Sequence, residues 1–239
     1  MTATSIDASA DDHTDLPARI DAATAMRRLS HAIVSHRAEI SDLHRIAAAA
    51  EELAARIETQ PARSRLDEMM TNPRFEAALE SGSLDRAVDD GAFVDLFHDS
   101  PVSGSANPLG MGLRISRDGD EAVGTINLGP GWEGAPGRGH GGIVAACVDE
   151  TIGGLLPILG TMAFTGELTL KYRAPCPLAT PLEFRASLQR RDGRKLYIEC
   201  IGTSPEGLFV EATALFIAVD LDHLAGLIAQ APTSEDTEQ

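Results

Sequence analysis

The chain has 239 residues, of which 43% are hydrophobic, and its formal net charge is −16. This length suits one large domain, or a mid-sized domain with an extension, and the apolar content is sufficient for a core. The first 17 residues carry four acidic and no basic side chains, and the last 20 carry five and none. The remaining sequence shows no strong basic excess, which argues against nucleic-acid binding as the main activity.

The three cysteines, Cys147, Cys176 and Cys200, match no zinc or disulfide spacing. Cys147 and Cys200 lie in apolar runs and are expected to be buried thiols in a reducing compartment. The N-terminus lacks the basic and apolar regions of a secretory signal, and no uninterrupted apolar stretch approaches the roughly 18–20 residues of a membrane span. We therefore expect a soluble cytoplasmic protein with no membrane span and no metal site.

Residues 1–16 are polar and acidic, and predict a disordered tail. A helical pattern then runs from Pro17, which suits a first helical turn, to about Gln60, and Pro61 ends it. The pattern can be written as heptads with Met26, Ile33, Ile40, Ala47 and Ala54 at one position and Leu29, His36, Leu43, Ala50 and Ile57 at the other. This helix either packs on its own domain or forms a coiled-coil arm in a dimer. With shorter helices predicted at 62–70, 73–81 and 84–97, residues 17–99 form a helical extension.

The pattern changes at Ser100, where the loop SPVSGSANPLG begins a second segment, 100–220. Two strands joined near Asp118-Gly119-Asp120 are followed by a glycine-rich loop and an apolar helix of about 14–17 residues beginning at HGG. Four alternating segments follow, with hairpin turns predicted at Asp192-Gly193 and Glu206-Gly207. These four predicted strands lie within 164–175, 180–193, 195–207 and 208–220. A short helix near 221–230 and an acidic tail complete a last segment, 221–239.

Two strands, one helix and four strands predict an α+β fold in which an antiparallel sheet wraps around the helix. Such a helix must be apolar on most sides. The apolar residues that meet this demand are Ile143, Val144, Ala145, Ala146, Cys147, Val148, Ile152, Leu155 and Leu156. Asp149 and Glu150 interrupt this run, and they are costly to bury unless they are paired, exposed on one face or functional.

The segment 100–219 resembles the hotdog-fold acyl-CoA thioesterases of the phenylacetate-pathway (PaaI-like) type. Three features carry this resemblance: His140-Gly141-Gly142 with Asp149 nine residues after the histidine, the approach WEGAPGRGHGG, and the strand TGELTLKYRAP with Tyr172 and Pro175. The resemblance covers about half of the chain and leaves out the helical extension.

The resemblance implies a hotdog fold whose subunits join edge to edge in a homodimer, with active sites at the dimer interface and dimers pairing into tetramers. It implies hydrolysis of an acyl-CoA thioester by water, without a metal or prosthetic group. Coenzyme A would enter only as part of the substrate.

The start of the predicted helix can stabilise the oxyanion of thioester hydrolysis. Free backbone N–H groups and the positive end of the helix dipole lie there, and glycines let a substrate approach closely. Gly141 and Gly142 are therefore candidate oxyanion donors, or else packing glycines at a crowded helix start. In the family the residue matching His140 lies beside the thioester; the alternative is a histidine that caps the helix.

Asp149 lies two turns after Gly142 on the same helical face and matches the family's catalytic carboxylate, which acts as general base or nucleophile. Glu150 is the alternative carboxylate, because another branch of hotdog thioesterases uses a glutamate on this helix. Thr165 matches a Thr or Ser that holds the attacking water from the opposite subunit, although strands favour β-branched residues in any case.

The loop before HGG lacks the Asn or Gln that related branches carry, so Trp132, Glu133 or Arg138 takes that role or the role is absent. Four cations, Arg138, Lys171, Arg173 and Arg194, are candidates for binding CoA phosphates, or are solvated surface charges. The competing hypothesis is a non-catalytic hotdog protein that binds acyl-CoA or an effector, or serves as a scaffold. A hotdog dehydratase or hydratase is disfavoured because the motifs of those enzymes do not occur. The sequence does not indicate the acyl group.

Overall fold

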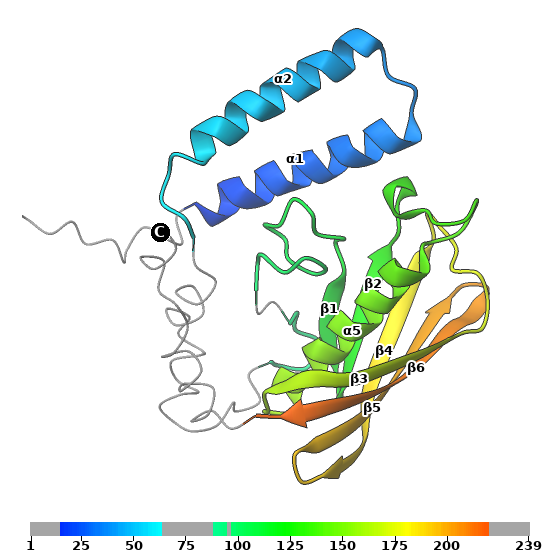
Figure 1. Ribbon diagram of the computed structural model, residues 1–239. Coiled ribbons are helices and arrows are strands. Elements are labelled where there is room, and N and C mark those ends of the chain that lie inside the picture. Colours follow the sequence, from blue (N-terminus) through cyan, green and yellow to red (C-terminus); the bar gives the residue numbers. More distant parts are fainter. Residues whose placement is uncertain (1–14, 64–87, 95–96, 220–239) are drawn as a thin grey trace, which may run out of the picture.

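The computed structural model describes residues 15–63, 88–94 and 97–219. Two N-terminal helices form a hairpin beside a curved sheet that holds a third helix (Figure 1). The elements are α1 (Leu16–Ser35), α2 (Ile40–Ile57), β1 (Arg114–Asp118), β2 (Glu121–Asn127), η1 (Pro130–Trp132), α5 (Gly141–Ile158), β3 (Ala163–Tyr172), β4 (Pro181–Asp192), β5 (Lys195–Ser204) and β6 (Gly207–Ala218). The predicted order of strands and helix in the second segment is thus confirmed.

The six strands form one antiparallel sheet in the order β1-β2-β4-β5-β6-β3, and α5 crosses one of its faces (Figure 1). The predicted hairpin turns are present, and Gly193 and Gly207 adopt positive φ angles there, which glycine accepts without strain. The inward residues of the strands and the apolar face of α5 form one core, in which Phe184 and Phe209 pack edge to face. The α+β fold predicted from the sequence is therefore observed.

Glycines let α5 lie close to the sheet. A Cβ on Gly124 of β2 would lie 2.3 Å from Thr151 Oγ1 of α5, and one on Gly154 of α5 would lie 2.7 Å from Ile115 Cγ2 of β1. Neither position can hold a larger residue unless Thr151 or Ile115 shifts. This packing fixes the height of α5 above the sheet and, with it, the position of Asp149.

β3 lies at an edge of the sheet and pairs only with β6 among the described strands. Its ladder carries a bulge at Gly166, because Thr165 pairs with Phe216 while Glu167 pairs with Leu215. The extra residue changes which face the preceding side chains occupy. Thr165 therefore lies on the same face as Leu168, toward α5.

The single helix predicted from Pro17 to Gln60 is wrong, because the chain leaves the helix after Ser35 and starts α2 at Ile40. Ser35 Oγ donates to His31 O at 2.7 Å and lies 2.7 Å from His36 Nδ1, and such local side-chain bonds compete with helix continuation. The heptad pattern consequently falls on two separate helices. The coiled-coil alternative cannot take the form of one continuous five-heptad helix.

The predicted helix 84–97 is also wrong over 88–94, which runs in extended and turn conformation along β1. Val94 N–H donates to Ile115 O, and Phe93 forms a bridge with Ser116. Val88 and Val94 are buried in the same core as the sheet, so the packed unit includes residues before position 100. The predicted acidic tail, the helices 62–70 and 73–81 and the C-terminal helix lie wholly or almost wholly outside the described residues.

Among the described helices, α5 alone is long and apolar enough to cross a membrane. Half of it is buried inside the protein, where the sheet wraps around it, and two carboxylates lie near its middle. A core helix passes the same test of length and composition, so α5 is weak evidence for a membrane span.

Candidate functional site

The start of α5 is capped by a histidine. The imidazole of His140, the N-cap residue, accepts a hydrogen bond from the Gly142 N–H at Nδ1, 3.0 Å away. Gly142 therefore already has a partner for its backbone donor, whereas the Gly141 N–H has no partner among the described residues. The capping alternative for His140 is observed. Its side chain is also exposed, which leaves the ring accessible to a ligand.

Three further bonds hold this helix start in place. Tyr172 at the end of β3 donates its hydroxyl to Gly141 O at 2.8 Å, and His140 N–H donates to Trp132 O at 2.9 Å. The preceding residue, Gly139, donates its N–H to Cys176 O, also at 2.9 Å. The backbone at Gly141 is thus fixed from the strand on one side and from the preceding loop on the other.

Asp149 and Thr165 are brought together. Thr165 Oγ1 donates to Asp149 Oδ1 at 3.0 Å, from the edge strand to the middle of α5. Asp149 is half-buried and Thr165 is exposed, so this carboxylate lies at the surface of the helix–sheet packing. The pair consists of two residues of one chain, whereas the resemblance expected the threonine to act from the opposite subunit.

Glu150 lies in a different environment from Asp149. Its Oε1 accepts hydrogen bonds from Ser100 Oγ at 2.5 Å and from Ser103 Oγ, both in the loop that precedes β1. Ser100 is buried and Glu150 is half-buried. Glu150 therefore holds the loop against α5. Because two hydroxyls already bind its carboxylate, it can accept fewer further hydrogen bonds than Asp149 can.

The cysteine of α5, Cys147, has an unreactive thiol. Cys147 is fully buried, and burial raises the pKa of its thiol to about 12. The thiolate is the nucleophilic form of cysteine, so a thiol with this pKa does not attack a thioester near neutral pH. Burial likewise raises the pKa values of Cys200, to about 12, and Cys176, to about 11. The predicted burial of Cys147 and Cys200 is confirmed.

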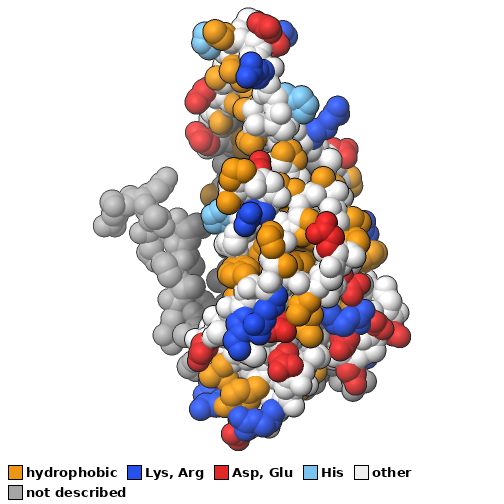
Figure 2. Space-filling model, turned by 90° about the vertical axis from the view of Figure 1, so that its right-hand side faces the viewer, with side chains coloured by type: hydrophobic (Ala, Val, Ile, Leu, Met, Phe, Trp, Pro, Cys, Tyr) orange, Lys and Arg blue, Asp and Glu red, His pale blue; other side chains and the backbone are white. Residues whose placement is uncertain are grey.

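The four candidate phosphate-binding cations do not converge. Arg173 forms an ion pair with Glu211, with its Nη2 at 2.6 Å from Oε2, and Arg194 donates its Nε to Ala218 O at 2.8 Å. Lys171 is exposed on β3, and Arg138 is exposed in the loop just before His140. Basic and acidic side chains are interspersed on the face shown in Figure 2. Of the four, Arg138 lies nearest in the chain to the start of α5.

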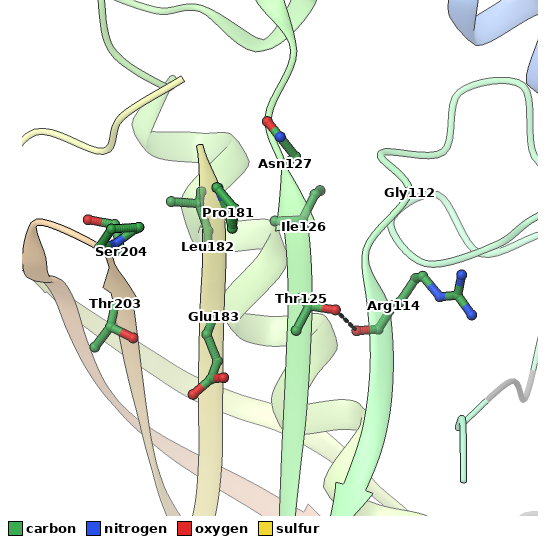
Figure 3. Close-up of a pocket in the computed structure, with 11 residues that line it drawn as sticks. Gly112, Arg114, Thr125, Ile126, Asn127, Pro181, Leu182, Glu183, Thr203 and Ser204 are labelled. Carbon is green, nitrogen blue, oxygen red and sulfur yellow. Dashed lines mark hydrogen bonds between the residues drawn. The ribbon is translucent and has the colours of Figure 1, made fainter. Parts of the chain in front are cut away.

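A hollow of about 520 Å³ lies on the other face of the sheet (Figure 3). Arg114, Thr125 and Glu183 line it from β1, β2 and β4, and these residues form one row across the ladder. Their neighbours Ile115, Gly124 and Phe184 face α5, so the row faces away from Asp149. None of the predicted site residues lines this hollow, which is therefore separate from the candidate site.

Sequence reasoning assigned no role to several residues that shape the site. In the sequence Tyr172 belongs to a family strand pattern, and Ser100 and Ser103 belong to a polar loop, yet all three bind groups of α5. For the two serines a sequence signal exists: a loop rich in hydroxyl side chains can supply the hydrogen-bond donors that a half-buried carboxylate such as Glu150 needs. The contact of Trp132 with α1 carries no local sequence signal, because its partner His31 lies about 100 residues away.

Known proteins with a similar sequence are acyl-CoA thioesterases. Acyl-coenzyme A thioesterase THEM4 of Mus musculus is 39% identical over 90 residues, which are 37% of this chain and 39% of that protein. The Bos taurus THEM4 is 32% identical over 121 residues, 49% of this chain and 50% of that protein. The chain thus spans about two fifths to one half of the length of these curated relatives. No family model matches it.

A solved structure described as a thioesterase superfamily protein, RHA08564, shares the fold. Its TM-score is 0.66 at 23% identity, and the match covers 83% of this chain and 90% of that one. This coverage exceeds the segment 100–220, so the likeness includes part of the N-terminal extension. The resemblance and the hotdog fold predicted from the sequence are confirmed.

Proposed function

We propose that this chain, which has the hotdog fold of the thioesterase superfamily, hydrolyses acyl-CoA thioesters with water. The observation that carries the proposal is the hydrogen bond from Thr165 Oγ1 to Asp149 Oδ1, just over two turns along α5 from the Gly141 N–H, which has no partner among the described residues. A hydrolase needs an oxyanion donor and a base that are held apart by one carbonyl and one water. This helix offers both groups, and the curated relatives are named acyl-CoA thioesterases.

The spacing of the two groups fits the reaction. Gly141 precedes Asp149 by eight residues, which is a rise of about 12 Å along the helix and a rotation of about 80° around it. A hydrogen bond to a carbonyl oxygen, the C=O bond, a water in attack position and its hydrogen bond to a carboxylate together span roughly 10 Å. Helix side chains lean toward the N-terminus, so the Asp149 carboxylate leans toward Gly141.

In the proposed reaction the thioester carbonyl oxygen accepts from the Gly141 N–H, and the helix dipole stabilises its developing negative charge. Asp149 takes a proton from water while the water oxygen attacks the carbonyl carbon. The tetrahedral intermediate then collapses with cleavage of the C–S bond. The CoA sulfur receives the proton from Asp149, giving a carboxylic acid and free CoA. Thr165 occupies Oδ1 and so directs the water to Oδ2.

The remaining predicted residues take supporting roles in this proposal. Gly142 becomes a second oxyanion donor only when its N–H exchanges His140 Nδ1 for the substrate oxygen. His140 then lies beside the thioester, as the resemblance implies. We assign the contact with the CoA moiety to Arg138, because it is exposed and is the nearest of the four candidate cations in the chain to the start of α5. The reaction as written requires no metal or prosthetic group. Cytoplasmic localisation remains part of the proposal.

We also propose that two copies of the chain pair through β3. This strand has ten residues and is largely exposed, with no partner on its outer side among the described strands. An edge of this length exposes a row of unpaired backbone groups, which natural proteins usually cover. Pairing of β3 with its copy would extend the sheet and bring the two Asp149 sites to the joined edge. Further pairing of such dimers would give a tetramer.

A panel of acyl-CoA substrates tests the proposed function, with free CoA detected by a thiol reagent. Asp149→Asn should lower kcat by about 10²–10⁴-fold, because that is the usual contribution of a general base. Thr165→Val should lower kcat less, since it removes only the hydroxyl that orients the carboxylate. Wild-type activity in Asp149→Asn would remove this mechanism. A wild-type chain that binds acyl-CoA without turnover on the whole panel would favour the non-catalytic binding protein.

A further inference from the structure

Helix α1 contacts the loop that leads into α5. The imidazole of His31 accepts a hydrogen bond at Nδ1 from the Gly131 N–H, 2.9 Å away. Its ring also meets the indole of Trp132 edge to face, with ring centroids 5.6 Å apart at 80°. Since Nδ1 accepts, the neutral ring carries its proton on Nε2.

The loop is shaped to receive this ring. A Cβ on Gly131 would lie 2.6 Å from His31 Nδ1, and a Cβ on Gly129 would lie 3.1 Å from the same ring. Two glycines therefore leave the space that the imidazole fills, while Trp132 closes one side of it. Residues of both α1 and the loop shape this contact. It is therefore a specific fit and not an incidental contact between a helix and a surface loop.

A line of hydrogen bonds continues from this contact to the start of α5. Trp132 follows Gly131, and Trp132 O accepts from His140 N–H at 2.9 Å. His140 Nδ1 in turn accepts from Gly142 N–H. These bonds connect Trp132 at the beginning of the loop with His140 at its end and with Gly142 of α5, so a shift at Gly131 is passed to the backbone that carries the Gly141 N–H.

A second anchor fixes α1 independently of this loop. Arg27, one turn before His31, donates from Nη1 to Asn107 O at 2.6 Å and to Ser105 O at 3.1 Å. Ala23, a further turn away, is buried. The helix is thus held against the loop before β1 even without His31. Removing the imidazole should therefore change the loop at 129–140 without releasing α1.

We propose that His31 is a positioning residue for thioester hydrolysis, acting through Gly131 and Trp132 on the oxyanion donor at Gly141. This proposal rests on the proposed function. It gives the N-terminal extension a role in the reaction itself: α1 holds the loop that presents His140 and the helix start. A residue of this kind should change kcat more than KM, because the oxyanion interaction is strongest in the transition state.

Three substitutions at position 31 separate the contributions of the ring. His31→Ala removes both the acceptor and the ring, His31→Asn keeps a side-chain acceptor close to the position of Nδ1, and His31→Phe keeps a ring without an acceptor. His36→Ala is the matched control, because His36 is exposed beyond the end of α1 and lies against Ser35. Gly131→Ala tests the same contact from the loop side, since its Cβ would displace the imidazole.

The chain offers a readout that does not depend on activity. Trp132 is the only tryptophan, so intrinsic fluorescence and its quenching by acrylamide report this loop alone. Steady-state kinetics and fluorescence are measured for these five single variants and for the double variant His31→Ala/Gly131→Ala, with circular dichroism to confirm that each is folded. Should wild type hydrolyse no thioester, the proposed function fails, and the fluorescence data still decide whether His31 holds the loop.

His31→Ala should lower kcat about tenfold with KM changed less than twofold, as expected for loss of roughly one hydrogen bond to a positioned group. It should also shift Trp132 emission and increase acrylamide quenching. His31→Asn should restore kcat to within about threefold of wild type, whereas His31→Phe should not. Gly131→Ala should match His31→Ala, and the double variant should be no worse than either, because both changes break one contact.

Several results would overturn the proposal. A wild-type kcat in folded His31→Ala would show that the contact only tethers α1. A lower kcat with unchanged Trp132 emission and quenching would show that His31 does not act through this loop. A change confined to KM, failure of His31→Asn to restore kcat, or an equal loss in His36→Ala would also contradict the positioning role.

Discussion

Asp149 and Glu150 are neighbours in the chain, but about 100° of helical rotation separates their side chains. Asp149 points toward the edge strand and has one hydroxyl partner, Thr165. Glu150 points toward the loop before β1 and has two, Ser100 and Ser103. A carboxylate already bound by two hydroxyls has less capacity to accept a proton from water. The two residues should therefore fail in different ways when they are substituted.

Glu150→Gln should lower the free energy of unfolding by about 1–2 kcal/mol, because it replaces hydrogen bonds to a charged acceptor with neutral ones. Its kcat, measured on folded protein, should stay within about twofold of wild type. Urea unfolding followed by circular dichroism gives the stability, and the thioesterase assay gives kcat. Asp149→Asn is the matched control and should show the reverse: lost turnover with little change in stability. A Glu150→Gln protein that is stable but inactive would show that Glu150, and not Asp149, is the general base.

At the scale of elements, the start of α5 depends on β3 as much as on its own sequence. The hydroxyl of Tyr172 reaches from the end of β3 to the carbonyl of Gly141, 2.8 Å away. Thr165 reaches from the other end of β3 to Asp149. One strand therefore contacts both the oxyanion end and the carboxylate of the proposed site. Their relative position is set by the strand as well as by the helix.

Tyr172→Phe should lower kcat several-fold and the free energy of unfolding by about 0.5–1.5 kcal/mol, since it removes one hydrogen bond at the helix start. Tyr197→Phe is the matched control, because Tyr197 is the only other tyrosine and its ring packs against the Arg190 guanidinium. No partner for its hydroxyl is found among the described residues. Thermal unfolding and kinetics of the two variants check this; equal losses in both would exclude a specific role for the Tyr172 hydroxyl.

The same strand shows how far the sequence could predict the site. Alternating apolar residues predicted β3, and the glycines after His140 predicted the helix start, because both are local patterns. Thr165 and Tyr172 are seven residues apart, so a regular strand would place them on opposite faces. The bulge at Gly166 places both toward α5. It depends on pairing with β6, about 50 residues further along the chain, and so leaves little local signal.

Local sequence patterns also predict the N-terminal extension only in part. Helical periodicity correctly indicated helices between Pro17 and Gln60, but it did not predict the break after Ser35. Nor could it indicate the face of α1 that carries Arg27 and His31, because their partners lie about 80 to 100 residues away. Polar residues that contact a distant loop look the same in sequence as polar residues in solvent.

At the scale of the whole molecule, β3 is an edge strand among the described strands, which raises the question of whether one chain holds a complete active site. Thr165 donates to Asp149 of its own chain, so this pair forms without a partner subunit. In the proposed dimer β3 meets its copy, and each Asp149 lies near the joined edge. A dimer is therefore expected to stabilise the edge and cover the site, while each chain supplies its own base and its own threonine.

Hybrid dimers test this arrangement directly. Light scattering should first give a mass of about twice 25.3 kDa for a wild-type dimer, or about four times that value where dimers pair into a tetramer. Asp149→Asn and Thr165→Val chains carrying different affinity tags are then co-expressed, and dimers that hold both tags are isolated. If each site takes both residues from one chain, the hybrid contains no intact site, and its kcat should not exceed the mean of the two parents.

If the threonine instead acted across the interface, one of the two sites in each hybrid would contain wild-type Asp149 and wild-type Thr165. Its kcat per dimer would then rise to about half that of wild type. Wild-type chains carrying the two tags provide the reference for full activity in a doubly tagged dimer. A fully active monomer in light scattering would contradict the proposed β3 pairing, but not the pairing of Asp149 with Thr165 within one chain.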